Sequence, residues 1–188
     1  MQVNCPSTSI IILIAASFLA AGPAAADVIN GDFEDGGTGW TVVNPSGWAG
    51  YFPPSGGNPD GAAVMRSPDA DSAGIGCFWQ TFMCGEPSDE TECVISLDYR
   101  LEDYGAEPGT GRVLMVFDGV TTLLTDMPGE WMQHTFTVPC GEHTIELCLE
   151  VDEGSHFWVA SFDNVQAYCS GVVPAEEESW SAIKTLFR

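Results

Sequence analysis

Two acidic residues near opposite ends of the chain are the side chains whose type and spacing most clearly indicate chemistry. Glu34 ends the string Asn30-Gly-Asp-Phe-Glu34, and Asp163 lies within Phe162-Asp-Asn-Val165. Carboxylate oxygens are the hard ligands that Ca²⁺ prefers. If an opening strand that carries Glu34 lies beside a closing strand that carries Asp163, the two carboxylates can share one calcium ion. We therefore expect a metal site where the folded domain begins and ends.

The elements that would position these carboxylates are short β-strands. After the N-terminal segment, brief runs of alternating apolar and polar residues are separated by Gly, Pro, Asp and Asn, which is typical of an all-β protein. Ile145, Leu147, Leu149 and Val151 all fall on one face of such a strand. No long run of helical periodicity interrupts the pattern, so we predict a sandwich of two antiparallel sheets. The expected strands are 28–34, 39–43, 62–66, 76–83, 92–101, 112–118, 120–124, 131–138, 143–151 and 157–168.

The charge of the chain limits its partners. It carries 27 acidic and only 5 basic side chains, which gives a formal net charge of −22 at pH 7. Such a surface repels nucleic acids and anionic membranes, so partners of these classes are not expected. Solubility or adaptation to a saline medium accounts for most of the acidic residues, because a bound cation needs only a few of them.

Residues 1–26 are expected to be a signal peptide rather than part of the fold. Residues 10–21 form an apolar run too short to span a bilayer comfortably, Pro23 breaks it, and Ala24-Ala-Ala26 supplies a small-residue cleavage pattern. A retained signal anchor is the alternative. No later apolar run is long enough for a transmembrane helix, and we expect a secreted, extracellular or cell-surface protein.

Residues 171–188 are predicted to be a linker and a C-terminal tail. Gly171-Val-Val-Pro174 has the composition of a linker, and Trp180, Ile183 and Phe187 fall on one face of a short helix. The tail resembles the Ser-Trp-x-x-Ile-Lys-x-Leu-aromatic-Arg endings of some exported bacterial proteins. A sorting or anchoring machine that recognises it would attach the protein to a cell surface. The alternative is a frayed or disordered end.

Six cysteines remain after the predicted signal peptide, and an even number in an exported chain indicates disulfide bonds. No Cys-x-x-Cys pair is present and the histidines lack metal-ligand spacing, which argues against a zinc or thioredoxin-like site. The sequence does not choose among the pairings: a Cys84–Cys93 bridge would close a loop, and a Cys140–Cys148 bridge would close a hairpin. The six residues are Cys77, Cys84, Cys93, Cys140, Cys148 and Cys169.

Several short motifs occur in an order that resembles a known family. The chain resembles the CenC-like carbohydrate-binding modules of families 4, 9 and 22, and the wider galactose-binding-like jelly rolls. The resemblance implies a jelly-roll β-sandwich domain over residues 27–170, with a structural calcium ion near the joined termini. It also implies that ligand binds on a concave face or in loops at the rim of the sandwich. The motifs are Asn30–Glu34, Gly39-Trp40, Phe78–Phe82, Ile95–Tyr99 and Phe162–Val165.

The resemblance also implies roles for individual residues. Glu34 and Asp163 would be the carboxylate ligands of the calcium ion, Asp32 or Asn164 could assist, and backbone carbonyls would complete the coordination. Ligand residues vary within the family, so no sugar site is transferred by motif. The ligand class implied is a glycan or polysaccharide.

Sugar binding requires flat aromatic faces together with polar groups that fix the hydroxyls. If Phe78 and Phe82 lie in the core, Trp79 between them is exposed and becomes a stacking platform. Trp40 is expected in the core, and burial is the common alternative for every aromatic residue of a sandwich. The candidate platforms are Trp48, Tyr51, Trp79, Trp131 and Trp158.

Catalysis is not the expected function. The sequence has no nucleophile elbow, His-Glu-x-x-His string or Ser-His-Asp arrangement, and with so many acidic residues chance carboxylate pairs discriminate nothing. We predict a non-catalytic glycan-binding protein. The alternative is a structural or adhesive surface protein that uses the same sandwich without binding sugar.

Overall fold

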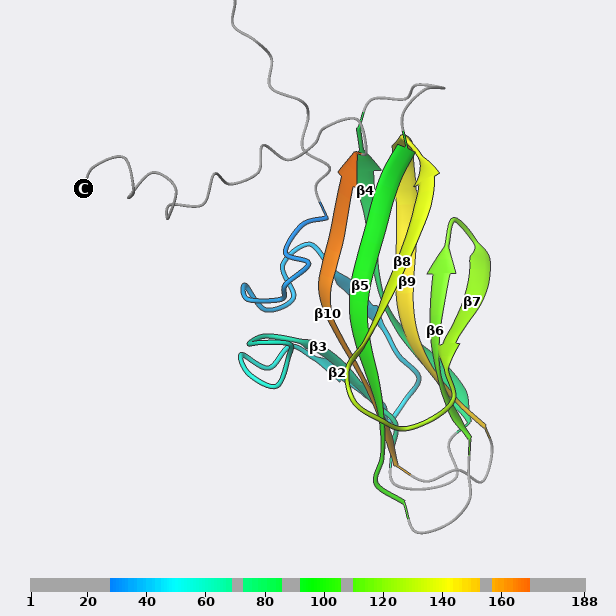
Figure 1. The fold of residues 1–188 in the computed structure, drawn as a ribbon. Coiled ribbons are helices and arrows are strands. Elements are labelled where there is room, and N and C mark those ends of the chain that lie inside the picture. The colour runs from blue at the N-terminus through cyan, green and yellow to red at the C-terminus, as the bar shows by residue number, and fades with distance from the viewer. Residues whose placement is uncertain (1–27, 69–72, 86–91, 106–109, 153–156, 170–188) are drawn as a thin grey trace, which may run out of the picture.

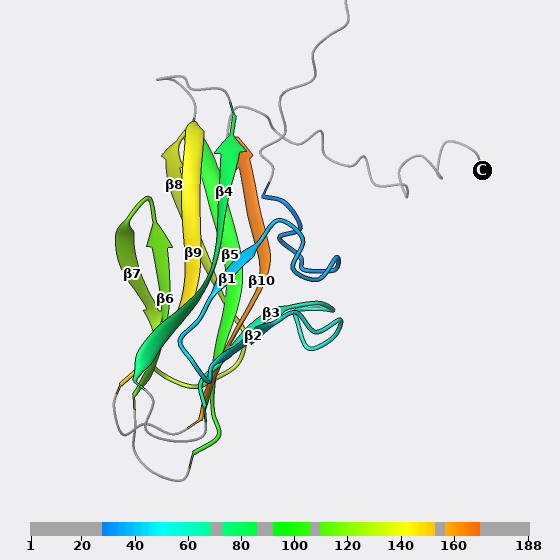
Figure 2. The ribbon, with the colours of Figure 1, turned by 180° about the vertical axis from the view of Figure 1, so that it is seen from behind.

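The computed structural model describes residues 28–68, 73–85, 92–105, 110–152 and 157–169. The predicted signal peptide at residues 1–26 and the predicted tail at residues 171–188 lie outside these ranges. The described part contains strands and no helix, and hence no helix that could cross a membrane (Figures 1 and 2).

Ten strands form two antiparallel sheets that pack face to face, which confirms the predicted jelly-roll β-sandwich (Figure 1). The first sheet has the strand order β1-β4-β9-β6-β7, and the second has the order β2-β3-β10-β5-β8. Strands far apart in the chain are therefore neighbours, as with β10 between β3 and β5. The bounds are β1 (Thr41–Val43), β2 (Ala49–Tyr51), β3 (Ala63–Arg66), β4 (Gly74–Cys84), β5 (Glu92–Asp103), β6 (Gly111–Phe117), β7 (Val120–Thr125), β8 (Met132–Pro139), β9 (Gly141–Val151) and β10 (Trp158–Cys169).

The core lies between the sheets and follows the predicted alternation. Ile145, Leu147 and Leu149 of β9 are completely buried, as are the inward residues of β5 that face them. Each fully buried aliphatic side chain of this size contributes about 1.5–3 kcal/mol to folding. Trp40 and Phe78 are also buried, which confirms their expected place in the core.

The segment 28–34 is not the strand that we predicted. It forms a series of turns, because Asn30 and Phe33 adopt left-handed backbone conformations with φ of 50° and 55°. The Asn30 side chain holds these turns by donating to the carbonyl of Gly36 and accepting from the N–H of Asp35. Asparagine tolerates this conformation better than most residues, so the motif encodes a turn.

The opening segment nevertheless lies beside the closing strand. The N–H of Val165 on β10 donates to the carbonyl of Gly31 at 2.8 Å. A Cβ atom on Gly31 would lie 1.9 Å from the carbonyl oxygen of Val165, so only glycine permits this approach. The expected proximity of the two ends is confirmed, although only one of them is a strand.

Gln80 anchors the same opening segment to the first sheet. Its side chain is buried, accepts the N–H of Ile29 at 2.7 Å, and donates to the carbonyls of Ile29 and Gly39 at 3.0 and 3.1 Å. A buried amide that satisfies three backbone groups fixes the path of the chain before β1.

Two disulfide bonds join strands of the described chain. The Cys84–Cys93 bridge confirms one of the two pairings considered from the sequence. The Cys140–Cys148 pairing is wrong, because Cys148 is bonded to Cys77. The register of β4 and β9 places these two residues directly opposite each other, with Cα atoms 4.1 Å apart, whereas Cys140 precedes the far end of β9.

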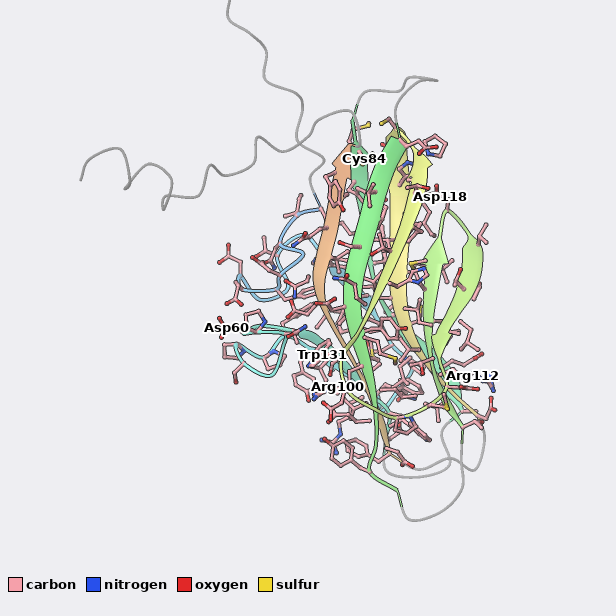
Figure 3. All side chains as sticks on the ribbon, viewed as in Figure 1. Asp60, Cys84, Arg100, Arg112, Asp118 and Trp131 are labelled. Atoms are coloured by element: carbon pink, nitrogen blue, oxygen red, sulfur yellow. A yellow bond between two sulfur atoms is a disulfide. The ribbon has the colours of Figure 1, made fainter. Side chains whose placement is uncertain are left out.

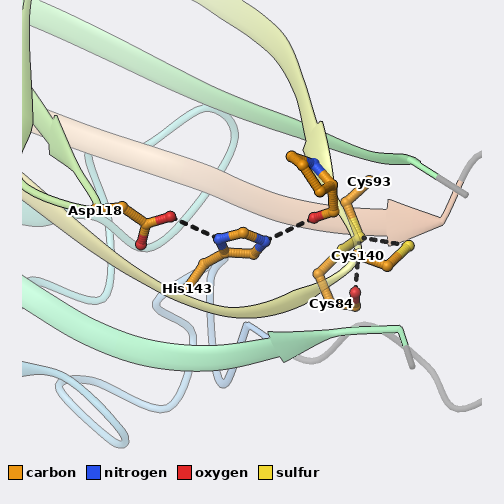
Figure 4. The surroundings of a disulfide bond; sticks show 6 residues. Cys84, Cys93, Asp118, Cys140 and His143 are labelled. Carbon is orange, nitrogen blue, oxygen red and sulfur yellow. Dashed lines mark hydrogen bonds and ion pairs between the residues drawn. A yellow bond between two sulfur atoms is a disulfide. The ribbon is translucent and has the colours of Figure 1, made fainter. Parts of the chain in front are cut away.

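A hydrogen-bonded histidine lies beside the Cys84–Cys93 bridge (Figure 4). The Sγ atom of Cys140 is 3.7 Å from that of Cys93, within the same buried corner. His143 lies 2.7 Å from a carboxylate oxygen of Asp118 through Nδ1, and 2.8 Å from the carbonyl of Pro139 through Nε2. Both ring nitrogens thus have an oxygen partner. This contact fastens the β6–β7 turn to the start of β9.

Candidate functional site

Three carboxylates gather where the loop between β2 and β3 crosses the outer face of the second sheet. Asp98 on β5 and Asp163 on β10 are directly opposite in the strand register, and both are buried. Glu34 reaches the same region from the opening turns and accepts the N–H of Gly61 at 2.8 Å. We call Glu34, Asp98 and Asp163 the acidic cluster. It joins the opening segment, two strands and one loop.

Amide groups surround the acidic cluster. The N–H of Asn58 donates to Oδ2 of Asp163, and the N–H of Asn164 donates to Oδ1 at 2.6 Å. The side-chain amides of Asn58 and Asn164 both donate to Oδ2 of Asp98, at 3.2 and 2.9 Å. Among the residues that the structure describes, no lysine or arginine pairs with these carboxylates. The hydrogen bonds that the described residues donate to Asp98 and Asp163 thus come from neutral amide groups.

Burial governs the electrostatics of Asp163, which is only 1% exposed. Loss of hydration raises the pKa of this carboxyl above its ordinary value, and repulsion from Asp98 and Glu34 raises it further. The backbone N–H groups of Asn58 and Asn164 act in the opposite direction, and the net pKa is raised. The ionised form of Asp163 is thus disfavoured in the absence of a cation.

The residues present have the chemistry of a calcium site. Every ligand on offer is an oxygen, from carboxylates, the Asn58 and Asn164 amides or the surrounding backbone carbonyls, and calcium takes six to eight such ligands. The three carboxylates do not all approach within 4.8 Å of one another, so an ion here would need backbone or amide oxygens as well. The one compact group of potential ligands in the described chain is Cys77, Glu146 and Cys148, whose sulfurs form a disulfide and are not thiolates.

The sequence-based ligand set differs in part from this cluster. Glu34 and Asp163 both accept backbone N–H groups of the β2–β3 loop, from Gly61 and Asn58 respectively. The carboxylate of Asp32 is exposed and accepts the N–H of Glu34 at 3.3 Å, so it stabilises a turn. Asn164 contacts the cluster through its amide. Asp98 was missed, because strand alternation placed it on a polar face and gave no sign that Asp163 lies opposite.

A groove lies on the same outer face of the second sheet, next to the acidic cluster. It has a volume of about 320 Å³, which is within the usual range of ligand pockets. Arg100 and Ser161 are opposite each other in the strand register at its floor, two residues along their strands from Asp98 and Asp163. We call it the Tyr51 groove; the lining residues that matter most are Tyr51, Ser55, Arg66, Arg100, Tyr104 and Phe157.

Aromatic rings and guanidinium groups are interleaved along the groove. The guanidinium carbon of Arg66 lies 3.9 Å from the ring centre of Phe157. The ring centre of Tyr104 lies 5.3 Å from that of Phe157. Arg100 lies 5.1 Å from the ring of Trp131 and forms an ion pair with Glu102 at 3.0 Å (Figure 3). Tyr51 and Tyr104 remain 44% and 61% exposed. The groove therefore offers open ring faces beside charged donors and acceptors.

The predicted aromatic platforms separate into three groups. Trp48 and Trp158 are buried in the core and present no ring face to a ligand. Tyr51 lines the groove, and Trp131 packs against Arg100 at its border. Trp79 is 37% exposed on the opposite sheet, while its neighbour Phe78 is buried, as the alternation predicted.

The surroundings of Trp79 are mostly apolar. It borders a shallow depression of about 500 Å³ on the outer face of the first sheet, together with Val43, Ile75, Cys77 and Glu146. Val43 and Ile75 are exposed. Glu146 is the one charged residue among the described residues that line this depression. The depression therefore has fewer polar groups for hydroxyl recognition than the Tyr51 groove.

Comparison with known proteins identifies the fold. No protein-family model matches the sequence, and no curated protein is detectably similar to it. TmCBM61, solved in complex with β-1,4-galactotriose, has 13% identity and a TM-score of 0.53 over 78% of this chain and 98% of its own. The K3 cleaved adhesin domain of Lys-gingipain from Porphyromonas gingivalis W83 has 16% identity and a TM-score of 0.51 over the same shares.

A CBM4 structure is also similar, with 18% identity and a TM-score of 0.48 over 73% of this chain and 99% of its own. At these identities the similarity concerns the fold. The chain thus has the β-sandwich fold of carbohydrate-binding modules, which an adhesin domain also has.

Proposed function

We propose that this protein binds a glycan or polysaccharide without catalysis, through the Tyr51 groove. The observation that carries the proposal is the combination in one groove of exposed tyrosine rings with convergent polar side chains. Sugar rings present C–H faces that stack on aromatic rings, and hydroxyl rims that need hydrogen-bond partners. Tyr51 and Tyr104 supply the first, and Arg100, Glu102 and Ser161 supply the second.

The fold is compatible with this function. TmCBM61 holds a β-1,4-linked trisaccharide on a sandwich of the same kind. In the present chain the groove floor is made by paired strands, which keep Ser161 and Arg100 in fixed register. A rigid floor reduces the entropy that a ligand must offset on binding.

We also propose that the acidic cluster holds a structural calcium ion. Glu34, Asp98 and Asp163 would be the carboxylate ligands, and backbone or amide oxygens would complete the coordination. The ion would supply the positive charge that the buried Asp163 lacks, and it would hold the opening turns, β5 and β10 together. Support comes from the absence of a basic partner among the described residues and from the raised pKa of Asp163.

The cysteines support export. Two disulfide bonds in one small domain are typical of proteins that fold in an oxidising compartment. We infer a secreted or cell-surface location, in agreement with the predicted signal peptide. Attachment through the C-terminal tail is part of the same proposal.

The experiment that tests glycan binding is affinity electrophoresis of the full secreted chain against a panel of polysaccharides. We expect at least one polysaccharide to retard the protein, and Tyr51→Ala to weaken that binding about tenfold, since one stacked ring is worth about 1 kcal/mol or more. Tyr168→Ala is the matched control, because Tyr168 is similarly exposed but lies at the other end of β10. Equal loss in both variants, or no retardation by any polysaccharide, would refute the proposal.

An adhesive role is the second candidate, and the apolar face around Trp79 favours it. Val43, Ile75, Trp79 and Leu123 are all exposed on the outer face of the first sheet. Contiguous exposed apolar side chains are typical of protein contacts. If Trp79→Ala abolishes binding to a cell surface while Tyr51→Ala leaves it intact, the adhesive function is the correct one.

A further inference from the structure

We propose that the glycan bound in the Tyr51 groove is anionic and that its carboxylate or sulfate groups pair with Arg66 and Arg100. This inference rests on the proposed function and adds the chemical class of the ligand. An anionic sugar would place its ring on Tyr51 or Tyr104 and its charged group against the guanidinium donors. The observations that support it are the distribution of basic residues, their geometry and their contrast with a third arginine.

Basic residues are very rare in this chain, and two of them line one groove. The sequence has 5 lysines and arginines against 27 aspartates and glutamates. Arg66 and Arg100 lie in the Tyr51 groove with Glu102 as its one acidic lining residue. Two guanidinium groups and one carboxylate thus line the groove of a protein whose net charge is −22.

The positions of the two arginines suit the recognition of oxyanions. The guanidinium carbon of Arg66 lies over the Phe157 ring, 3.9 Å from its centre, and that of Arg100 lies over the Trp131 ring, 5.1 Å from its centre. Stacking on a ring orients the guanidinium plane, and its N–H donors lie along the edge, where they match a carboxylate or a sulfate. Both arginines line the groove, where such donors can meet a bound oxyanion.

Arg112 is an arginine of the same protein whose ion pairs lie outside the groove. It lies on β6 of the first sheet, far from the groove (Figure 3), and pairs with both Glu150 and Asp152. These contacts raise the pKa of Arg112, chiefly through its hydrogen bond to Asp152. Among the described residues, Arg100 forms an ion pair with Glu102. Arg112 is therefore the matched control for charge removal.

The large net negative charge does not prevent this binding at physiological salt. The Debye length is then about 8 Å, so most surface carboxylates are screened from a ligand in the groove. Besides Glu102, which pairs with Arg100, the carboxylates of Asp98 and Asp163 lie next to the groove. A calcium ion held by the acidic cluster would compensate them, so anion binding should be measured with calcium present.

The test compares charged and neutral forms of the same glycan by isothermal titration of the full secreted chain. One pair is galacturonan oligosaccharides and their methyl esters, and a second is a sulfated galactan and its desulfated form. We expect at least tenfold tighter binding of a charged form, because hydrogen bonds to charged groups are worth about 1.5–3 kcal/mol. The two pairs distinguish a carboxylate from a sulfate as the recognised group.

Variants then assign the preference to the groove. Arg66→Gln and Arg100→Gln should reduce binding of the charged form at least about tenfold and binding of the neutral form by a smaller factor, whereas Arg112→Gln should change neither. Arg100→Lys, which keeps the charge, should retain part of the preference and shows that loss in Arg100→Gln is not misfolding. Equal binding of charged and neutral forms would overturn the inference and leave the proposed function standing. Absence of binding to either form, and to every polysaccharide of the panel, would overturn both.

Discussion

Asp98 and Asp163 lie directly opposite each other on β5 and β10, and the side-chain amide of Asn164 donates to Asp98 while its backbone N–H donates to Asp163. Two buried carboxylates at one cross-strand position repel each other unless a positive charge lies nearby. Among the described residues, no basic side chain forms an ion pair with either carboxylate. The pair is the strongest structural argument for a cation at the acidic cluster.

Removal of calcium should therefore destabilise the protein. A ligand that binds only the native state stabilises it by about 2.7 kcal/mol at a concentration 100 times its Kd. We expect a chelator to lower the melting temperature of the wild type, and Asp163→Asn to abolish this calcium dependence. Differential scanning calorimetry with and without calcium measures both. Asp126→Asn, an exposed change in a turn away from the cluster, should keep the full response.

The pH dependence of stability should reverse between the calcium-free and calcium-bound protein. Burial raises the folded-state pKa of Asp163. The native state then binds more protons than the unfolded chain between the unfolded and the folded pKa, so the contribution of this group to stability falls as pH rises through that window. Bound calcium favours the ionised carboxylate and gives the opposite sign.

Urea denaturation between about pH 4 and pH 7, with chelator and with calcium, measures this reversal. The difference in slope between the two conditions should be much smaller in Asp163→Asn, which cannot titrate. A wild-type slope of the same sign and size in both conditions would contradict a cation at this carboxylate.

The two disulfide bonds should differ in their contribution to stability. Cys77 and Cys148 are 71 residues apart in the sequence, and Cys84 and Cys93 are 9 apart. In the chain-entropy model the longer loop is worth about 4 kcal/mol and the shorter about 3 kcal/mol. We expect the double change Cys77→Ala, Cys148→Ala to lower the free energy of unfolding more than Cys84→Ala, Cys93→Ala. Urea titrations of both variants decide the order, and the reverse order would contradict it.

A single added methyl group in the β2–β3 loop should disturb both proposed sites. A Cβ atom on Gly57 would lie 1.6 Å from the carbonyl oxygen of Gly61 and 2.6 Å from Oδ2 of Asp163. Gly57→Ala must therefore displace the loop, and we expect weaker binding of both calcium and glycan. Titration calorimetry with each ligand is the measurement. Gly129→Ala is the control, because a Cβ atom there would meet nothing within 4 Å.

Much of this architecture follows from local sequence pattern. Alternation located nine of the ten strands and placed Phe78 inside and Trp79 outside, because burial on one face of a strand has a period of two residues. The missed strand, β2, has only three residues in a loop rich in glycine and proline. The false strand at 28–34 contains the apolar alternation of a strand, but Asn30 and Phe33 take left-handed conformations.

The candidate sites could not be predicted from local sequence pattern, because they form only when β5 and β10 pair in a particular register. Nothing around Asp98 signals that Asp163 lies across from it, 65 positions further along the chain, until β5 and β10 are paired. The same pairing brings Arg100 beside Ser161, so the groove could not be recognised from the aromatic residues alone. Trp48 and Trp158 resembled Tyr51 in the sequence, and only packing distinguishes them.

The loop between β2 and β3 contributes residues to both proposed sites. Ser55 and Gly56 form one wall of the groove, and Asn58 and Gly61 bind the carboxylates a few residues later. A ligand in either proposed site would restrict the same short piece of backbone. Thermodynamic linkage requires that calcium and glycan change each other's affinity by the same factor. If both proposals hold, the calcium concentration would set the affinity of this protein for its glycan, and binding would respond to the ionic composition of the surroundings.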